Sequence, residues 1–296
     1  MKASMPTILI LGASSFLTKP LVKKLVGINK FQIICQSRTN LEGCYGNYES
    51  EIIYLSINYA NNNYPSEIFQ NCTYIIKLVN ASSLSHEQLI NFRRFLKHVI
   101  FVSKADLIHL STASVYGKNI NKTITELSEC NPKNIYQINK LKDEIEIKKI
   151  AEYFDIRFYI LRPTEIVGER SLNAKKFIKN YQSGSILKKY LLKSLYRKRL
   201  SHFVSSNFLI QNITTIIEGE IPKGIYIVSQ DNESLNSFFE ILKVIDSKLD
   251  PKIKANKFNF HLPLWLFFSF FYMIFRSNQV SIKSRFMSRN PIINPN

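Results

Sequence analysis

The sequence predicts an α/β fold built on a doubly wound parallel sheet, with a smaller region at the carboxyl-terminal end. Two observations support this class. Short apolar runs rich in β-branched residues alternate with helical stretches along most of the chain. The first of these runs also ends at a glycine turn that leads straight into a helix. A chain of 296 residues is long enough to bury the core of such a sheet.

The first strand is expected at residues 7–11, a continuous run typical of a strand covered on both faces. It ends at Gly12, and an apolar stripe that starts at Leu17 then indicates a helix. A strand, a tight turn and a helix N-terminus together form a cradle for a dinucleotide pyrophosphate. Of the three glycines usual in such a cradle only Gly12 remains, since Ser15 and Thr18 stand at the other two positions. A plain turn without a ligand therefore stays open.

The second strand is expected at residues 31–35, and Arg38 follows its end. An acidic residue here would hold the adenosine ribose hydroxyls, whereas an arginine accommodates a 2′-phosphate. Arg38 therefore slightly favours NADP over NAD, with an ordinary surface arginine as the alternative. Further strands are expected at residues 52–57, 74–79, 107–110, 157–161 and 224–229, and helices at 85–102 and 136–154.

Hydroxyl-bearing residues follow the strand at 107–110. The stretch 111–117 reads Ser-Thr-Ala-Ser-Val-Tyr-Gly. Because ligands bind at the carboxyl ends of parallel strands, Thr112 is placed to hydrogen-bond a hydroxyl or carbonyl group of a substrate.

Tyr136 and Lys140 stand four residues apart at the start of a helical run, so their side chains share one helix face. An ammonium group beside a phenol favours the phenolate, and we therefore expect the pKa of Tyr136 to fall from its usual ~10. Such a pair transfers protons, while Thr112 holds the substrate. A chance pair on the surface is the alternative.

Taken together, these stretches resemble the extended short-chain dehydrogenase/reductase family, which includes NAD-dependent epimerases, dehydratases and reductases of nucleotide sugars. The motifs that carry the resemblance are residues 12–17, 111–117 and 136–140, which occur in the family's order and at about its spacing. Residues 161–168 and 224–229 resemble later parts of it. The resemblance implies a Rossmann-like fold, with residues 1–170 as the dinucleotide-binding domain and 171–296 as a substrate-binding region.

The resemblance also implies roles for single residues. Tyr136 becomes the general acid/base, Lys140 its electrostatic partner and a ligand of the cofactor ribose, and Thr112 the hydroxyl that orients the substrate. The cofactor, NAD or NADP, would be bound by Gly12, Ser15, Phe16, Leu17, Arg38 and Lys140, and the nucleotide sugar by Thr112 and Thr164. No metal site is expected, since the four cysteines lie far apart without histidines at ligand spacing.

One departure bears on the reaction. In the dehydratase branch an Asp-Glu pair follows the active-site threonine, whereas Ala113 and Ser114 follow Thr112 here. Neither side chain serves as a general acid or base, so epimerisation or reduction of a keto sugar is favoured over dehydration. The lost glycines favour a different alternative, a non-catalytic relative that acts as a nucleotide-sensing or assembly subunit.

The formal net charge of +18 points to anionic partners such as phosphorylated small molecules, nucleic acid or an acidic membrane surface. A general bias of the sequence toward lysine, with the basic side chains on a solvated face, explains this net charge equally well. Nucleic acid is disfavoured, because the chain carries no recognised nucleic-acid-binding module. Scattered cysteines and the lack of a signal-peptide pattern predict a cytoplasmic protein. The family resemblance further implies an enzyme of polysaccharide biosynthesis. Helices 85–102 and 136–154 leave a homodimer open.

The carboxyl-terminal third carries basic amphipathic runs from about Ser171 through residues 197–199, which would suit a diphosphate. The apolar stretch 262–275 is shorter than the ~20 residues of a membrane-spanning helix. We expect a docked helix there, followed by a basic tail. Insertion into a membrane interface, and hence peripheral membrane contact, stays open.

Overall fold

The computed structural model of the chain describes residues 5–39, 41, 44–57, 59, 64, 66–80, 83–117, 123–169, 171–185, 189, 192–193, 200–219, 221–233, 236–249 and 287–288. The expected apolar helix at 262–275, most of the basic tail and the basic run 197–199 lie outside these residues. Within the described ranges, every helix is too short or too polar to cross a bilayer.

A parallel sheet of seven strands forms the centre of the molecule, in the order β10, β7, β5, β4, β1, β2, β3. The predicted doubly wound α/β class is thereby confirmed. The strands are β1 (Thr7–Leu11), β2 (Gln32–Ser37), β3 (Ile52–Ser56), β4 (Cys72–Lys77), β5 (Asp106–Leu110), β7 (Phe158–Pro163) and β10 (Gly224–Val228).

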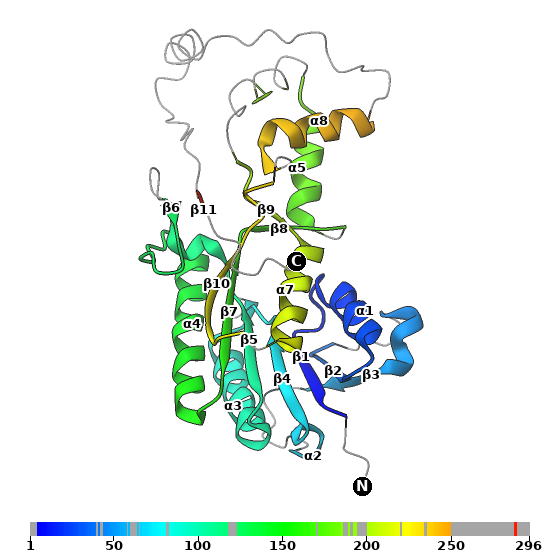
Figure 1. The fold of residues 1–296 in the computed structure, drawn as a ribbon, viewed down its shortest axis with the longest axis vertical. Coiled ribbons are helices and arrows are strands. Elements are labelled where there is room, and N and C mark those ends of the chain that lie inside the picture. The colour runs from blue at the N-terminus through cyan, green and yellow to red at the C-terminus, as the bar shows by residue number, and fades with distance from the viewer. Residues whose placement is uncertain are drawn as a thin grey trace.

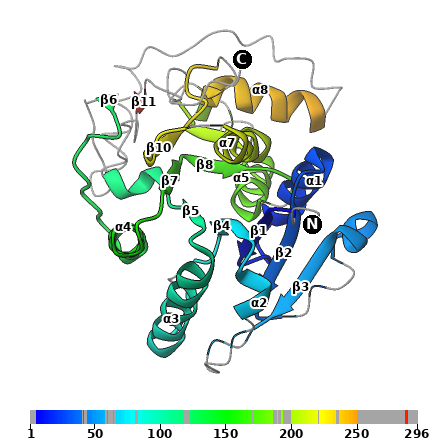
Figure 2. The same ribbon diagram turned by 60° about the horizontal axis from the view of Figure 1, so that its bottom comes forward.

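Helices cover both faces of this sheet (Figure 2). The helices α1 (Thr18–Ile28) and α7 (Ser206–Glu218) pack on one face. On the other lie α3 (His86–Ser103) and α4 (Ile135–Phe154), with the short α2 (Ser66–Phe69) beside α3. Each face holds its own hydrophobic core, which is why the strands are apolar on both sides.

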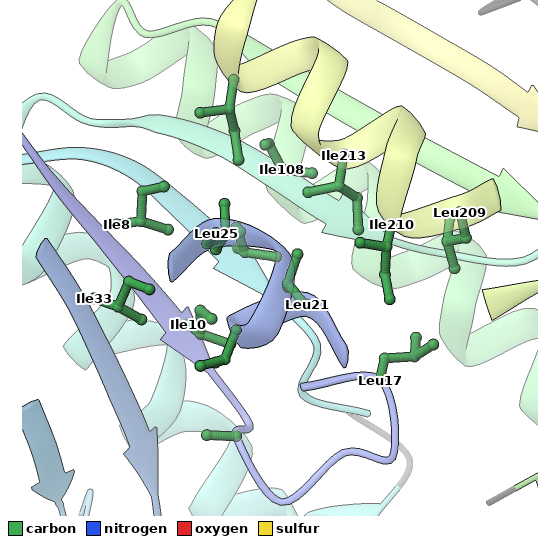
Figure 3. Packing of buried hydrophobic residues seen from close by; sticks show 14 of the residues in the cluster. Ile8, Ile10, Leu17, Leu21, Leu25, Ile33, Ile108, Leu209, Ile210 and Ile213 are labelled. Carbon is green, nitrogen blue, oxygen red and sulfur yellow. The ribbon is translucent and has the colours of Figure 1, made fainter. Parts of the chain in front are cut away.

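The strand β1 shows how one run of residues serves both cores. Ile8 and Ile10 face α1 and α7, whereas Leu9 and Leu11 face α3, and all four side chains are fully buried. Figure 3 shows the first of these cores, in which leucines of α1 and isoleucines of α7 close over β1 and β5. Because alternate side chains of a strand point to opposite faces, β1 contributes to the cores on both sides of the sheet.

Of the remaining elements, η1 (Gly46–Glu51) lies beside α1 and leads into β3, whereas most of the others lie at the carboxyl edge of the sheet or beyond it (Figure 1). The helices α5 (Leu172–Gln182) and α8 (Phe238–Leu249) pack together there, with Tyr181 hydrogen-bonded to Asp246. The other short elements are η3 (Ala113–Tyr116), β6 (Thr123–Ile124), β8 (Glu165–Val167), β9 (Phe203–Ser205) and β11 (Met287–Ser288).

Two details differ from the expected boundaries. The strand β2 runs on to Ser37, so Arg38 follows the strand directly. Beyond residue 170 the chain forms α5 but then returns to the sheet and supplies α7 and β10. The division of function at residue 170 therefore stays a prediction, although the main sheet draws on both sides of it.

Candidate active site

The turn after β1 keeps the shape of a pyrophosphate cradle around its remaining glycine. Gly12 has φ +83°, and a Cβ atom there would lie 2.8 Å from the backbone nitrogen of Val79. The backbone N–H groups of Gly12 and Ala13 donate to the carbonyl of Gln36, at the end of β2. Glycine is therefore required at this position, because the turn passes close to the segment that follows β4.

The other two glycine positions hold larger residues without loss of the turn. Ser15 accepts a hydrogen bond from the N–H of Leu17, at 3.4 Å, and Thr18 opens α1 with its side chain fully buried. The hydroxyl of Thr18 has no hydrogen-bond partner among the described residues. The N-cap residue Leu17 makes no side-chain capping hydrogen bond, and the positive end of the α1 dipole lies at the turn. The turn thus combines a close backbone approach at Gly12 with a helix N-terminus, two features of turns that bind a dinucleotide pyrophosphate.

The region that would hold the adenosine end of a dinucleotide offers hydroxyls and a guanidinium. Arg38 is exposed directly after β2, and the Ser37 and Thr39 hydroxyl oxygens beside it lie 3.2 Å apart. These groups suit ribose hydroxyls or a ribose phosphate.

Thr112 caps the short helix η3 at the carboxyl end of β5. Its hydroxyl oxygen accepts a hydrogen bond from the N–H of Ser114, at 3.2 Å, and its O–H donates to the Ser114 side chain. These bonds fix the threonine side chain at the edge of the sheet, where the sequence predicted it.

The segment before α4 is held against η3 by a glycine. Gly117 has φ +71°, and a Cβ atom there would collide with the carbonyl oxygen of Asn131. The N–H of Asn131 in turn donates to the carbonyl of Val115, at 3.1 Å. Asn134 then caps α4 by accepting a hydrogen bond from the N–H of Gln137, at 3.0 Å. This arrangement fixes the start of α4, and with it the tyrosine of its first turn, beside η3.

Tyr136 lies beside Thr112, as the sequence predicted, and 42% of its surface remains exposed. Burial raises the pKa of the phenol, the carboxylate of Glu165 raises it further, and a side-chain hydrogen bond with Thr112 lowers it. The net direction is upward, so the expected fall of the Tyr136 pKa is wrong. The expectation neglected both the burial of the ring and a carboxylate supplied by β8.

Lys140 is buried one turn below Tyr136, with 7% of its surface exposed. Its ammonium group donates to the carbonyl of Leu110, the last residue of β5, at 3.0 Å. Burial lowers the pKa of Lys140 to about 8, and the nearby Lys77 lowers it too, against the attraction of Asp143 and Glu144. A lysine that titrates this close to neutrality can change charge under working conditions.

Several charged residues beneath this site were missed in the sequence. Glu144 receives two hydrogen bonds from Arg162, at 3.1 and 2.6 Å, and a short one from Ser111. Arg162 also donates to the hydroxyl of Tyr116, at 2.7 Å. The signal was present in the sequence, because Glu144 stands four residues after Lys140 and so shares its helix face.

The predicted substrate residue Thr164 follows β7 at the same edge. It is buried, its N–H donates to the carbonyl of Val228, and its hydroxyl has no partner among the described residues. Of the predicted residues, Thr112 and Tyr136 lie side by side at the carboxyl edge, and Lys140 lies one helical turn below Tyr136.

A doubly wound parallel sheet, a pyrophosphate-type turn after its first strand and a Tyr-Lys pair at its carboxyl edge define the extended short-chain dehydrogenase/reductase class. Residues 8–199 match the family described as "NAD dependent epimerase/dehydratase family", and the chain belongs to that family. Comparison with curated proteins gives no match.

Solved structures of sugar-nucleotide enzymes share the fold. A dTDP-glucose 4,6-dehydratase of Bacillus anthracis in complex with NAD aligns with a TM-score of 0.61 and 16% identity, over 82% of this chain and 80% of that one. A UDP-N-acetylglucosamine 4-epimerase of Bacillus cereus aligns with a TM-score of 0.57 and 13% identity, over 76% and 78%. A UDP-glucuronic acid 4-epimerase of Bacillus cereus in complex with NAD gives 0.56 and 16%, over 75% and 77%. At these identities the likeness establishes the fold.

Proposed function

We propose that the chain is an NAD(P)-dependent epimerase or keto-sugar reductase that acts on a nucleotide sugar. The observation that carries the proposal is the meeting of Thr112 and Tyr136 at the carboxyl edge of the sheet, with Lys140 one helical turn below. Membership of an NAD-dependent family and the ligands of the structural relatives support it.

In this proposal the bound dinucleotide supplies or accepts the hydride. Tyr136 gives a proton to the sugar oxygen during reduction and removes one during oxidation. Because its pKa is raised, the phenol is protonated at neutral pH and starts as the acid. Thr112 holds the same sugar oxygen, and the charge of Lys140 favours the phenolate once the proton has left.

The cofactor is assigned to the first turn of the fold. Gly12, Ser15, Phe16 and Leu17 would hold the pyrophosphate, Arg38 the adenosine ribose or its phosphate, and Lys140 the other ribose. The fit of the turn around Gly12 supports this assignment, and the groups around Arg38 are compatible with NAD and with NADP.

The reaction class follows from the residues after Thr112. Ala113 and Ser114 carry no carboxyl group, so elimination of water lacks the acid and base expected at those two positions. Epimerisation and keto-sugar reduction need only hydride transfer and the proton relay of Tyr136.

The remaining assignments are proposals as well. We place residues 171–296 in the substrate-binding region and the enzyme in the cytoplasm, in polysaccharide biosynthesis. A homodimer through α3 and α4 is supported by apolar side chains exposed on these helices, among them Phe101, Ile145 and Tyr153. Peripheral membrane contact rests on the net charge and on the apolar stretch 262–275, which lies outside the described residues.

Cofactor binding is tested by thermal unfolding with NAD and NADP added separately. Ligand at a hundred times its dissociation constant should stabilise the fold by ~2.7 kcal/mol. A melting temperature that neither cofactor changes would support the non-catalytic relative.

Catalysis is tested with Tyr136→Phe on a panel of UDP-, GDP- and dTDP-sugars. The variant should bind cofactor normally and lose turnover, because only the phenolic hydroxyl, the group that exchanges the proton, is removed. Tyr153→Phe is the matched control, since this tyrosine lies on the same helix and is 82% exposed. Parental turnover by Tyr136→Phe would exclude the phenol from the reaction.

A further inference from the structure

A second lysine is buried beneath the candidate site. Lys77 ends β4 with only 1% of its surface exposed. Its ammonium group donates to a carboxylate oxygen of Asp143 at 2.6 Å, and lies 3.4 Å from the carbonyl of Val79. A charge buried this deeply is costly unless it is paired, so the position of Lys77 depends on Asp143.

The same carboxylate faces a histidine that adds no compensating charge. His109 of β5 is the in-register neighbour of Lys77, and its Nε2 atom lies 3.6 Å from the same oxygen of Asp143. Burial and then the charge of Lys77 lower the pKa of His109 well below its usual value, so the ring is neutral.

The charges around Lys140 do not balance. The helix α4 presents two buried carboxylates, and each is already engaged: Asp143 by Lys77 of β4 and Glu144 by Arg162 of β7. Arg93 of α3 adds a further positive charge that acts on Lys77. The ammonium group of Lys140 is therefore left without a carboxylate of its own in the described cluster, and its hydrogen bond goes to the neutral carbonyl of Leu110.

We propose that Lys77, held in place by Asp143, is a positioning residue that controls whether Lys140 carries a charge. The proposal rests on the proposed function, in which the charge of Lys140 supports proton transfer by Tyr136. Repulsion from Lys77 makes it easier for Lys140 to lose its proton, and the pairing of Asp143 with Lys77 weakens the attraction that would oppose this. The direction agrees with the lowered pKa of Lys140, about 8, to which burial contributes most and Lys77 next.

The test follows the titration of Lys140 itself, in protein labelled with ¹³C at the lysine ε-carbon. NMR spectra of the full chain without added ligand are recorded against pH, and the Lys140 signal is identified by its loss in Lys140→Met. We expect a midpoint near 8 in the parent. In Lys77→Met the midpoint should rise by about one pH unit or more, a tenfold gain in proton affinity.

Three variants complete the experiment. Lys77→Arg keeps the positive charge and should restore the parental midpoint. Arg157→Met is the control. Arg157 is half-exposed and pairs with Asp106, which lies on the same strand as His109, so its loss should leave the Lys140 midpoint unchanged. If Lys77→Met does not fold, the double variant Lys77→Met/Asp143→Leu, which replaces the ion pair by two apolar side chains, takes its place. It should also raise the Lys140 midpoint, because Lys77 acts on Lys140 more strongly than Asp143 does.

A midpoint that is the same in the parent and in the folded Lys77 variant overturns the proposal. The role in the relay is read from the pH profile of kcat/KM, whose alkaline limb should move upward together with the Lys140 midpoint. An alkaline limb of kcat/KM that stays in place while the Lys140 midpoint moves also overturns the proposal. The NMR titration needs neither cofactor nor substrate, so a lack of turnover in the parent counts against the proposed function and not against the link between Lys77 and Lys140.

Discussion

Replacing Lys140 by methionine should stabilise the fold while it removes a residue of the proposed site. The pKa of this lysine falls from 10.5 to about 8 on folding, and the folded chain therefore holds the proton less tightly than the unfolded chain. Keeping Lys140 charged at pH 7 costs about 3 kcal/mol. Methionine avoids that cost but loses the hydrogen bond to Leu110, worth about 1 kcal/mol. The expected net gain is about 2 kcal/mol.

The pH dependence makes this prediction specific. Unfolded chains bind more protons at Lys140 than folded chains do between pH 8 and 10.5, so the parent gains stability as the pH rises through this window. At pH 9 the cost of the charge has fallen to about 2 kcal/mol, and the advantage of the variant to about 1 kcal/mol.

Urea unfolding followed by circular dichroism at pH 7 and pH 9 measures both differences. The control is Lys149→Met, an exposed lysine of the same helix, which should change the stability by less than about 0.5 kcal/mol at either pH. A Lys140→Met variant that is less stable than the parent, or whose advantage is the same at both pH values, would refute the argument.

Three further predictions concern the elements that position the site. Glu144→Gln removes the negative charge that pairs with the buried Arg162 and should cost about 3–5 kcal/mol in urea unfolding. A loss below ~1 kcal/mol, as for a surface pair, contradicts it. Gly117→Ala forces a side chain against Asn131 at φ +71° and should cost more than about 1 kcal/mol, with turnover lost because the start of α4 moves. Thr112→Val should lower kcat on the sugar panel about 10²-fold or more, whereas Thr112→Ser, which keeps the hydroxyl, should retain most of it; equal rates in the two variants would exclude the hydroxyl.

The fold was predictable because its signals are local. Each expected strand is found in the sheet, since a continuous apolar run such as Thr7–Leu11 can be buried on both faces only in a covered parallel sheet. The end of β2 was less predictable. Gln36 and Ser37 are polar and read as a loop, yet both are buried in the strand, where Gln36 pairs with Leu11 of β1. Pairing with a neighbouring strand outweighs local polarity there.

Of the candidate site, only the outermost groups were predicted from the sequence. Thr112 and Tyr136 were found because their motifs are short and fall at element ends, and the structure places them side by side. The charged layer below was not found. Lys142, Asp143 and Lys149 belong to one charged run that reads as a solvated helix face, and only Asp143 of these three is buried. Which charge points inward depends on strands that meet α4 only after the chain has folded.

The distribution of buried residues along α4 explains why the candidate site depends on three strands of the sheet. Toward its end the helix is held by apolar side chains, Ile147, Ile150 and Ala151, which pack without a specific partner. Near its start it is held by ion pairs whose partners come from β4 and β7, and by a hydrogen bond from Lys140 to the end of β5. Ion pairs and hydrogen bonds are directional, so they form only when those three strands are in register. The hydrophobic end can therefore fix α4 to the sheet, but only the charged end can set the height and rotation at which Tyr136 meets Thr112.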